Sequence, residues 1–224
     1  MVTVKRQAPL QPSERAPDFA LPAVDREGQV SLADYRGKRP LLLAIFRGVY
    51  CAFWRRHLAH LAVTREKLRA VGVETLAIVA TELDRARLYF RYHPTSVPLV
   101  ADPELSTHRS YGLQEMPMTP LTLLRMLTAR VNPTGELPKP MSLLKVGGVL
   151  DRMDNFEATE TDRDDKRRQG RQLIGQFLVD RDGIVRWLNI EGAKEGPAGL
   201  GKFPSDDELL AVARALPSGA TGAR

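Results

Sequence analysis

The first half of the chain alternates apolar runs with helical segments, and this rhythm restricts the fold more than any other feature. Apolar runs of strand length at residues 39–46 and 73–80 each precede a segment with helical periodicity, 51–70 and 83–92. A third short run follows at 97–102. Runs that are apolar at nearly every position are typical of strands covered on both faces. The sequence therefore predicts an α/β domain with a largely parallel sheet and right-handed crossovers.

The rhythm breaks in the second half of the chain. Residues 114–170 contain several prolines and the charged run Thr161–Arg168, which we interpret as a solvated loop. This segment is expected to be an insertion with one or two short helices and a mobile loop. Asp182-Gly183 then lies between two β-rich runs and predicts a hairpin. Ser205, followed by three acidic residues, predicts the start of a last helix.

These patterns give a provisional division of the chain. Residues 1–15 are polar and contain prolines, so they are expected to form a flexible arm. Residues 16–216 form the predicted domain, interrupted by the insertion at 114–170. The tail at 217–224 is expected to be disordered.

Cys51 is the single cysteine of the chain, and it lies where an apolar run and a four-residue turn lead into a helix. Unpaired N–H groups and the helix dipole favour an anion at such a position, and the thiolate is the reactive form of cysteine. Arg47 lies four residues before Cys51 and Arg55 four residues after it, on the same helical face. We expect Arg55 to be exposed and screened by solvent. Inert packing is the alternative, because free cysteines are often buried.

Composition narrows the classes of protein and partner. One cysteine excludes an intrachain disulfide framework and fits a reducing compartment. The net charge is +6, but basic residues are interspersed with acidic ones and are not interleaved with aromatic residues, so nucleic acid is not an expected partner. No segment has the length and apolarity of a membrane span or signal peptide. A cytoplasmic location is the default expectation.

Two other patterns are interpreted structurally. His57 and His60 lie about 240° and 180° around the helix from Cys51, so neither is expected to face the sulfur. A packing or surface role is favoured over a metal site because no third ligand is evident. Residues 192–202 are rich in glycine, but Phe203-Pro204 separates them from the next helix, so a connector is favoured over a phosphate loop. No metal and no cofactor are expected.

Several segments of the chain carry a pattern shared with a known family: Ala16-Pro-Asp-Phe-Ala-Leu-Pro22, Ser31-Leu-Ala-Asp-Tyr-Arg-Gly-Lys38, Phe46-Arg-Gly-Val-Tyr-Cys51, residues 97–113 and Phe177-Leu-Val-Asp-Arg-Asp-Gly-Ile-Val-Arg186. In this order they resemble the peroxiredoxin-like branch of the alkyl hydroperoxide reductase and thiol-specific antioxidant superfamily. The resemblance covers most of residues 16–216 outside the insertion. It implies a thioredoxin-like α/β fold, with a central mixed sheet flanked by helices and a helical insertion before the C-terminal hairpin.

The chain departs from the pattern of this family at three positions. Relatives often carry a second cysteine three residues after the first, where this chain has Trp54. Peroxiredoxins place a threonine or serine three residues before the reactive cysteine, where this chain has Gly48. They also place an arginine before the hairpin strand; Ile174 occupies that slot, and Arg171 is a loose substitute.

The resemblance implies thiol-based redox chemistry with one cysteine. Cys51 would attack a small peroxide, Arg47 and Arg55 would support the charge, and Gly48, Tyr50 and Trp54 would line the site. An external thiol or a thioredoxin-like reductant would restore the cysteine, and a homodimer is compatible with the sequence. The alternative is a non-catalytic thioredoxin-fold binding protein with a vestigial cysteine, which the three departures favour.

Overall fold

A five-stranded mixed sheet forms the centre of the structure, a computed structural model that describes residues 8–133 and 135–217. The strand order is β5-β4-β3-β8-β9. The pairs β3–β4 and β4–β5 are parallel, whereas β3–β8 and β8–β9 are antiparallel. The strands are β3 (Leu41–Phe46), β4 (Glu74–Val79), β5 (Leu99–Ala101), β8 (Gly175–Val179) and β9 (Val185–Ile190).

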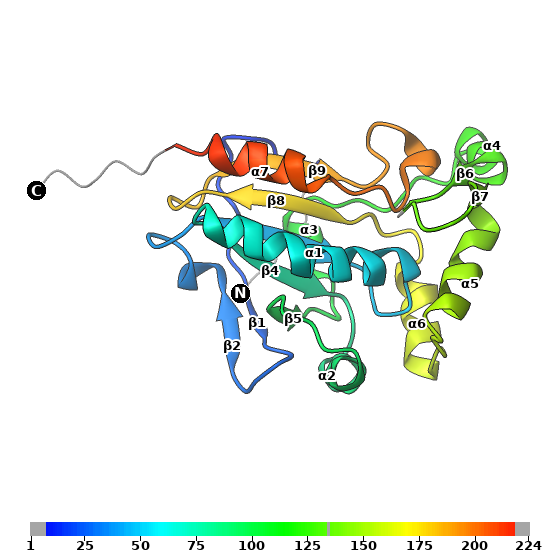
Figure 1. Ribbon diagram of the computed structural model, residues 1–224, viewed down its shortest axis with the longest axis horizontal. Coiled ribbons are helices and arrows are strands. Elements are labelled where there is room, and N and C mark those ends of the chain that lie inside the picture. Colours follow the sequence, from blue (N-terminus) through cyan, green and yellow to red (C-terminus); the bar gives the residue numbers. More distant parts are fainter. Residues whose placement is uncertain (1–7, 134, 218–224) are drawn as a thin grey trace, which may run out of the picture.

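Helices and short hairpins surround this sheet (Figure 1). The N-terminal hairpin consists of β1 (Ala20–Pro22) and β2 (Gln29–Ser31), and a second small hairpin of β6 (Arg130–Val131) and β7 (Met141–Ser142). The α-helices are α1 (Ala52–Ala70), α2 (Leu83–Tyr92), α3 (Ser106–Ser110), α4 (Pro120–Thr128), α5 (Leu143–Met153), α6 (Glu160–Gln169) and α7 (Asp206–Arg214). Two 3₁₀ turns lie at Leu32–Asp34 and Gly196–Gly199. No helix within the described ranges is both long and apolar enough to cross a membrane.

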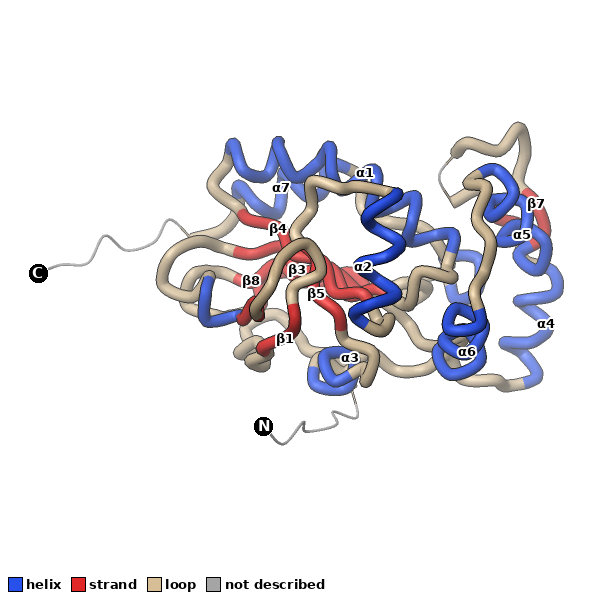
Figure 2. Tube along the Cα trace, turned by 90° about the horizontal axis from the view of Figure 1, so that it is seen from below, coloured by secondary structure: helices blue, strands red, loops and turns tan. Residues whose placement is uncertain are grey.

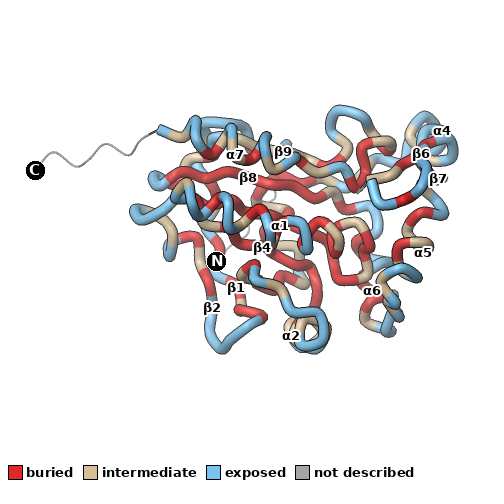
Figure 3. Tube along the Cα trace, in the orientation of Figure 1, coloured by how far each residue is buried: buried red, intermediate tan, exposed pale blue. Residues whose placement is uncertain are grey.

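The apolar run of β3 is buried on both faces, as its composition predicts. Side chains alternate along a strand. Leu42, Ala44 and Phe46 face one core, which α1, α2 and α7 cover, as Figure 2 shows from below. Leu41, Leu43 and Ile45 face the opposite core. Figure 3 shows the resulting continuous burial through the central strands.

The described part of the expected N-terminal arm packs against the domain. Leu10 is fully buried, and its N–H donates to the carbonyl of Tyr111 at 3.2 Å. Ser13 N–H donates to the Val185 carbonyl at 2.8 Å. Residues 8–15 therefore cover the second core instead of extending from it, and residues 1–7 lie outside the described ranges, as does most of the expected disordered tail (218–224).

Segment 114–170 is a helical insertion at one end of the sheet (Figure 1). It contains α4, α5 and α6 together with the β6–β7 hairpin. The predicted solvated loop at Thr161–Arg168 is wrong, because this run lies within helix α6. Thr159 and Asp162 form a capping box at its start, and basic residues fill its last turn, where the helix dipole favours positive charge.

Helix α6 also buries part of its charge. Asp162 is fully buried and accepts a hydrogen bond from Arg85 of α2 at 2.6 Å. Asp165 is fully buried as well, paired with Arg168 and bonded to the Thr81 hydroxyl at 3.1 Å. Arg85 and Thr81 lie outside the charged run, so composition alone could not reveal that the acids are buried.

The hairpin and last helix agree with the sequence patterns. Strands β8 and β9 are joined through Asp182-Gly183, where Gly183 has a positive φ of 81°. Ser205 caps α7, since its hydroxyl accepts the N–H of Glu208 at 3.2 Å.

Candidate active site

Cys51 lies where the sequence places it, at the junction of a central strand and a helix. Strand β3 ends at Phe46, and Cys51 is the N-cap residue of α1. The intervening turn is closed by a hydrogen bond from Cys51 N–H to the Gly48 carbonyl at 3.1 Å. The Cys51 residue is 8% exposed and packs within the core cluster under α1. Access to the sulfur is therefore restricted to small reagents.

Arg47 supplies a positive charge directly beside this cysteine. Its guanidinium donates to the Gln172 carbonyl at 2.8 Å and to Glu191 Oε1 at 3.1 Å. Burial opposes protonation of Arg47, but attraction to Cys51 and then to Glu191 raises its pKa above the ordinary value. Arg47 and Glu191 are 6% and 2% exposed, so solvent screens the pair little. The site thus holds a fixed cation against the sulfur, with a carboxylate that balances part of its charge.

Tyr50 contributes a protonated hydroxyl. Burial raises the pKa of its phenol, while the charge of Arg47 lowers it and that of Cys51 raises it further. Among the described residues, the buried Tyr50 hydroxyl has no hydrogen-bond partner. A buried donor without a partner costs free energy unless it serves a ligand or a reacting atom. The hydroxyl of Tyr50 is thus a buried donor that no protein group among the described residues accepts.

Gly48 has no room for a side chain. A Cβ built at this position lies 2.8 Å from Thr81 Oγ1, 3.0 Å from Tyr50 Cδ1 and 3.1 Å from the Ala80 carbonyl. Thr81 follows β4, and its hydroxyl accepts the N–H of Val49 at 3.0 Å. The Thr81 hydroxyl therefore lies directly beside position 48 and binds the same turn.

The insertion holds the cysteine turn in place. Gln169, at the end of α6, accepts the N–H of Gly48 at 3.1 Å and donates to the Ala80 carbonyl at 2.8 Å. Asp165 accepts from the Thr81 hydroxyl at 3.1 Å, and burial raises the pKa of this carboxyl. Sequence reasoning missed Thr81, Gln169 and Glu191 as site residues. Only the position of Thr81, directly after a central parallel strand, carried a usable signal.

Arg55 takes a different position from the expected one. The prediction of an exposed Arg55 is wrong, because the residue is 7% exposed. Its guanidinium donates to the Val49 carbonyl at 2.9 Å, and ion pairs join it to Asp151 and Asp154 at 2.6 and 3.0 Å. Two carboxylates therefore compensate its charge. Arg55 stabilises the turn through its hydrogen bond to the Val49 carbonyl.

Trp54 is also part of the frame of the turn. It is fully buried, its ring stacks on Phe46 at 5.4 Å, and its indole N–H donates to the Gly48 carbonyl at 2.5 Å. Trp54, which occupies the position of the second cysteine of many relatives, thus stabilises the turn that leads to Cys51.

The remaining sequence candidates lie outside the site. Arg171 pairs with Glu115 at the surface, whereas Ile174 is fully buried in the core that contains Cys51. His57 is buried and stacks on Phe203 at 3.7 Å, and burial lowers the pKa of His57 to about 3. His60 lies 3.0 Å from Asp206. Within the described ranges, no group of three or more histidine, cysteine or acidic side chains could hold a metal ion.

The arrangement suits nucleophilic chemistry at sulfur. A helix N-terminus and a buried guanidinium favour the thiolate, and a protonated phenol can donate to an oxygen that gains negative charge. Glu191 and the Gln172 carbonyl hold Arg47, and the Trp54 indole N–H donates to the Gly48 carbonyl of the turn. Such a frame limits movement of the sulfur relative to its surrounding charges.

Comparisons with known proteins identify the family of this chain. Residues 12–188 match the AhpC/TSA family. The thiol-disulfide oxidoreductase ResA of Halalkalibacterium halodurans is 30% identical over 142 residues, which cover 62% of this chain and 71% of ResA.

Three solved structures share the fold. A reduced 2-Cys peroxiredoxin from Plasmodium vivax superposes with a TM-score of 0.59 at 17% identity, covering 92% of this chain and 82% of the other. A putative thiol:disulfide interchange protein DsbE from Chlorobium tepidum gives 0.53 at 19% identity, covering 91% and 99%. Peroxidoxin BcpB from Mycobacterium tuberculosis gives 0.54 at 14% identity, covering 96% and 99%.

These likenesses confirm the thioredoxin-like fold that the sequence predicts. The family match spans the N-terminal hairpin, the cysteine turn, β8 and the first part of β9. Together with the ResA match, it places the chain among peroxiredoxin-like and thiol-disulfide oxidoreductases. The chain belongs to the AhpC/TSA family.

Proposed function

We propose that this protein is a one-cysteine thiol peroxidase. The Cys51 thiolate attacks the terminal oxygen of a small hydroperoxide. The S–O bond forms as the O–O bond breaks, so the sulfur is oxidised by two electrons to sulfenic acid and the peroxide is reduced. The departing oxygen takes a proton and leaves as an alcohol, or as water when the substrate is hydrogen peroxide.

The observation that carries this proposal is the buried Arg47 guanidinium held beside Cys51 at the start of α1. Burial strengthens its interaction with an anion, because the local dielectric is lower than that of water. The Tyr50 phenol, which has no protein partner among the described residues, is available to donate to the peroxide oxygen. The 8% exposure of Cys51 favours small peroxides as substrates.

Recycling requires a partner, because the chain contains a single cysteine. An external thiol attacks the sulfenic acid, forms a mixed disulfide and releases water. A second external thiolate then breaks that disulfide and returns the Cys51 thiolate. A low-molecular-weight thiol or a thioredoxin-like reductant supplies both electrons. A homodimer and a cytoplasmic location remain predictions.

Peroxide consumption tests the proposal. The purified protein is mixed with hydrogen peroxide or a small alkyl hydroperoxide, with glutathione, dithiothreitol or a thioredoxin system as donor. Consumption above the donor background that disappears in Cys51→Ser supports the proposal. Consumption no faster than the background with every donor refutes turnover.

A non-catalytic binding protein is the second candidate. The nearly complete burial of Cys51 and the pairing of Arg47 with Glu191 favour it. Native alkylation separates the two candidates: labelling of Cys51 only after unfolding supports the binding protein, and labelling of the folded protein supports the peroxidase.

A further inference from the structure

The insertion presents an apolar helix to solvent. Helix α4 contacts α5 and the Gly196–Gly199 turn, yet none of its residues is buried. Figures 1 and 2 place α4 at the outer end of the molecule, away from the central sheet, and Figure 3 shows its exposed surface. Five of the ten large hydrophobic side chains that are exposed among the described residues lie within 118–127. The apolar composition of α4 therefore does not serve the core.

Four side chains of α4 form one broad surface, which we name the leucine face. Its members are between 48% and 57% exposed: Leu121, Leu123, Leu124 and Leu127. With 3.6 residues per turn they span roughly 160° of the helix circumference. Together they expose on the order of 400 Å² of apolar surface, a size at which the largest patch of a monomer is often functional.

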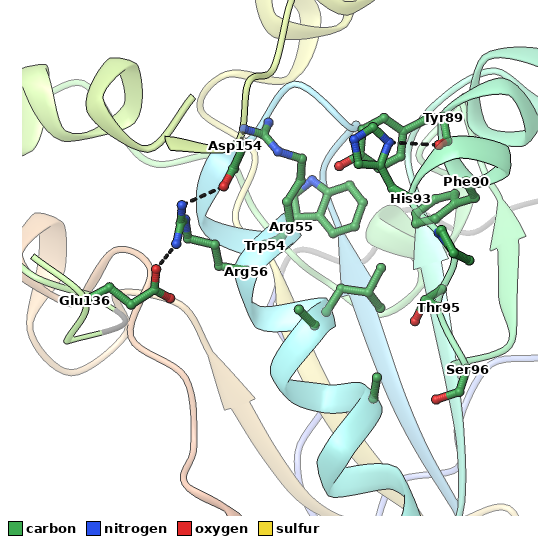
Figure 4. Close-up of a pocket in the computed structure, with 14 residues that line it drawn as sticks. Trp54, Arg55, Arg56, Tyr89, Phe90, His93, Thr95, Ser96, Glu136 and Asp154 are labelled. Atoms are coloured by element: carbon green, nitrogen blue, oxygen red, sulfur yellow. Dashed lines mark hydrogen bonds and ion pairs between the residues drawn. The ribbon is translucent and has the colours of Figure 1, made fainter. Parts of the chain in front are cut away.

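The acidic residues around this helix are neutralised by α1. Residues 116–154 contain three acidic residues, and each forms an ion pair with an arginine of α1. Asp151 pairs with Arg55, and Figure 4 shows Arg56 between Asp154 and Glu136. None of these carboxylates is left to balance a cation on the outer side of the insertion.

The basic residues of the same segment are not neutralised. Five of them are exposed, and none forms an ion pair with another described residue: Arg125, Arg130, Lys139, Lys145 and Arg152. The charges of the insertion are thus segregated, with the acids held against α1 and the cations facing solvent. An anionic partner would meet these cations without displacing an existing ion pair.

A lipid surface fits the apolar face and the cations together. A helix in the bilayer interface buries its apolar side at the boundary of headgroups and acyl chains, while lysine and arginine attract anionic headgroups. Fluid lipid can surround leucines that are spread over a protruding helix. A second copy of this chain fits the leucines but not the charges, because a two-fold interface would bring the same uncompensated cations of both copies together.

We propose that the leucine face of α4 docks on the surface of a membrane that contains anionic phospholipids. The helix lies in the interface and does not cross the bilayer. This role of the insertion is separate from the chemistry of Cys51 and stands whether or not the protein reduces peroxides.

Vesicle co-sedimentation of the full chain tests the proposal. The probes are vesicles of phosphatidylcholine alone and vesicles of equal parts phosphatidylcholine and phosphatidylglycerol, at low ionic strength. We expect at least tenfold tighter binding to the anionic vesicles, and release of the protein as the salt concentration rises. Absent binding, or equal binding to both kinds of vesicle, overturns the proposal.

Two matched variants locate the apolar contact. Leu124→Asp and Leu88→Asp each add one negative charge at an exposed helical leucine, the first on α4 and the second on α2. Leu124→Asp should weaken binding to the anionic vesicles at least tenfold, and Leu88→Asp less than threefold. Equal losses would assign the binding to net charge and overturn the leucine face as the site. Urea unfolding checks that both variants keep the fold.

A second matched pair locates the electrostatic contact. Arg125→Gln with Lys145→Gln removes two cations of the insertion, and Lys38→Gln with Arg181→Gln removes two exposed cations elsewhere. Each cation at an anionic surface contributes about fivefold to binding, so the first double variant should lose about 25-fold. The second double variant has the same net charge and should stay within threefold of wild type. Equal losses in the two double variants overturn the assignment.

Sedimentation velocity without lipid tests the rival occupant. We expect a wild-type protein that binds anionic vesicles and does not self-associate through α4. Self-association that Leu124→Asp abolishes, in a wild type that does not bind the anionic vesicles, would overturn membrane docking and assign the leucine face to a second copy of the chain.

Discussion

Adding one methyl group at Gly48 tests the packing of the cysteine turn. In Gly48→Ala, the new Cβ would lie 2.8 Å from Thr81 Oγ1 and 3.1 Å from the Ala80 carbonyl. The backbone carbonyl has little freedom to move, so the turn must shift. Overpacking of this kind costs about 1–3 kcal/mol, and urea unfolding should show that loss. Gly147→Ala is the matched control: its Cβ meets nothing within 4 Å inside α5, so it should stabilise the protein by about 0.4–1 kcal/mol.

A double-mutant cycle assigns the contact to Thr81. Thr81→Ala alone leaves the Val49 N–H without its acceptor, which costs about 1–3 kcal/mol. It also removes the oxygen that Gly48→Ala would meet. The double variant should therefore lose roughly 1 kcal/mol less than the sum of the single losses. Additive losses, or a Gly48→Ala variant as stable as wild type, would refute the close packing of position 48 against Thr81.

The other predictions concern charge, acid stability and the second thiol slot. Arg47→Ala should slow iodoacetamide labelling of Cys51 more than Arg55→Ala does, because Asp151 and Asp154 already compensate Arg55; equal rates in both variants and wild type would remove arginine activation from the account. Burial lowers the pKa of His57 from 6.5 to about 3, so between these values the unfolded chain binds more protons and stability falls as the pH falls. The free energy of unfolding that this histidine loses should be about 2 kcal/mol at pH 5. In His57→Phe, the urea midpoint should depend less on pH. An unchanged pH dependence would contradict the lowered pKa of His57. Trp54→Cys should form a disulfide with Cys51 on oxidation. The same variant should lower the free energy of unfolding by about 3–5 kcal/mol, because Trp54 is fully buried. Two free thiols after oxidation, measured by thiol titration, would contradict the disulfide geometry.

The fold was predictable because its signals are local and periodic. The runs before Phe46 and Ala80 are apolar throughout, and Asp182-Gly183 has the composition of a hairpin turn. The position of Cys51 follows from the same pattern, since a strand that leads into a helix places the residue between them at the helix start.

The site contacts and the buried charges could not be predicted, because they depend on segments that are distant in the sequence. Gln169 reaches Gly48 across 121 positions, and Glu191 reaches Arg47 across 144. Arg55 was predicted to be exposed because no sequence pattern shows that Asp151 and Asp154 lie beside it. The burial of Asp162 and Asp165 was missed for the same reason, since Arg85 and Thr81, which bond to them, lie far from α6 in the sequence.

Trapping of sulfenic acid at Cys51 is the most direct measurement of the central claim. The folded protein is treated with one equivalent of hydrogen peroxide in the presence of dimedone, and the modified residue is identified by mass spectrometry. Our account predicts a dimedone adduct on Cys51 in the folded wild-type protein and a smaller yield in Arg47→Ala. A Cys51 that remains an unmodified thiol in the folded protein, and oxidises only after unfolding, would contradict it.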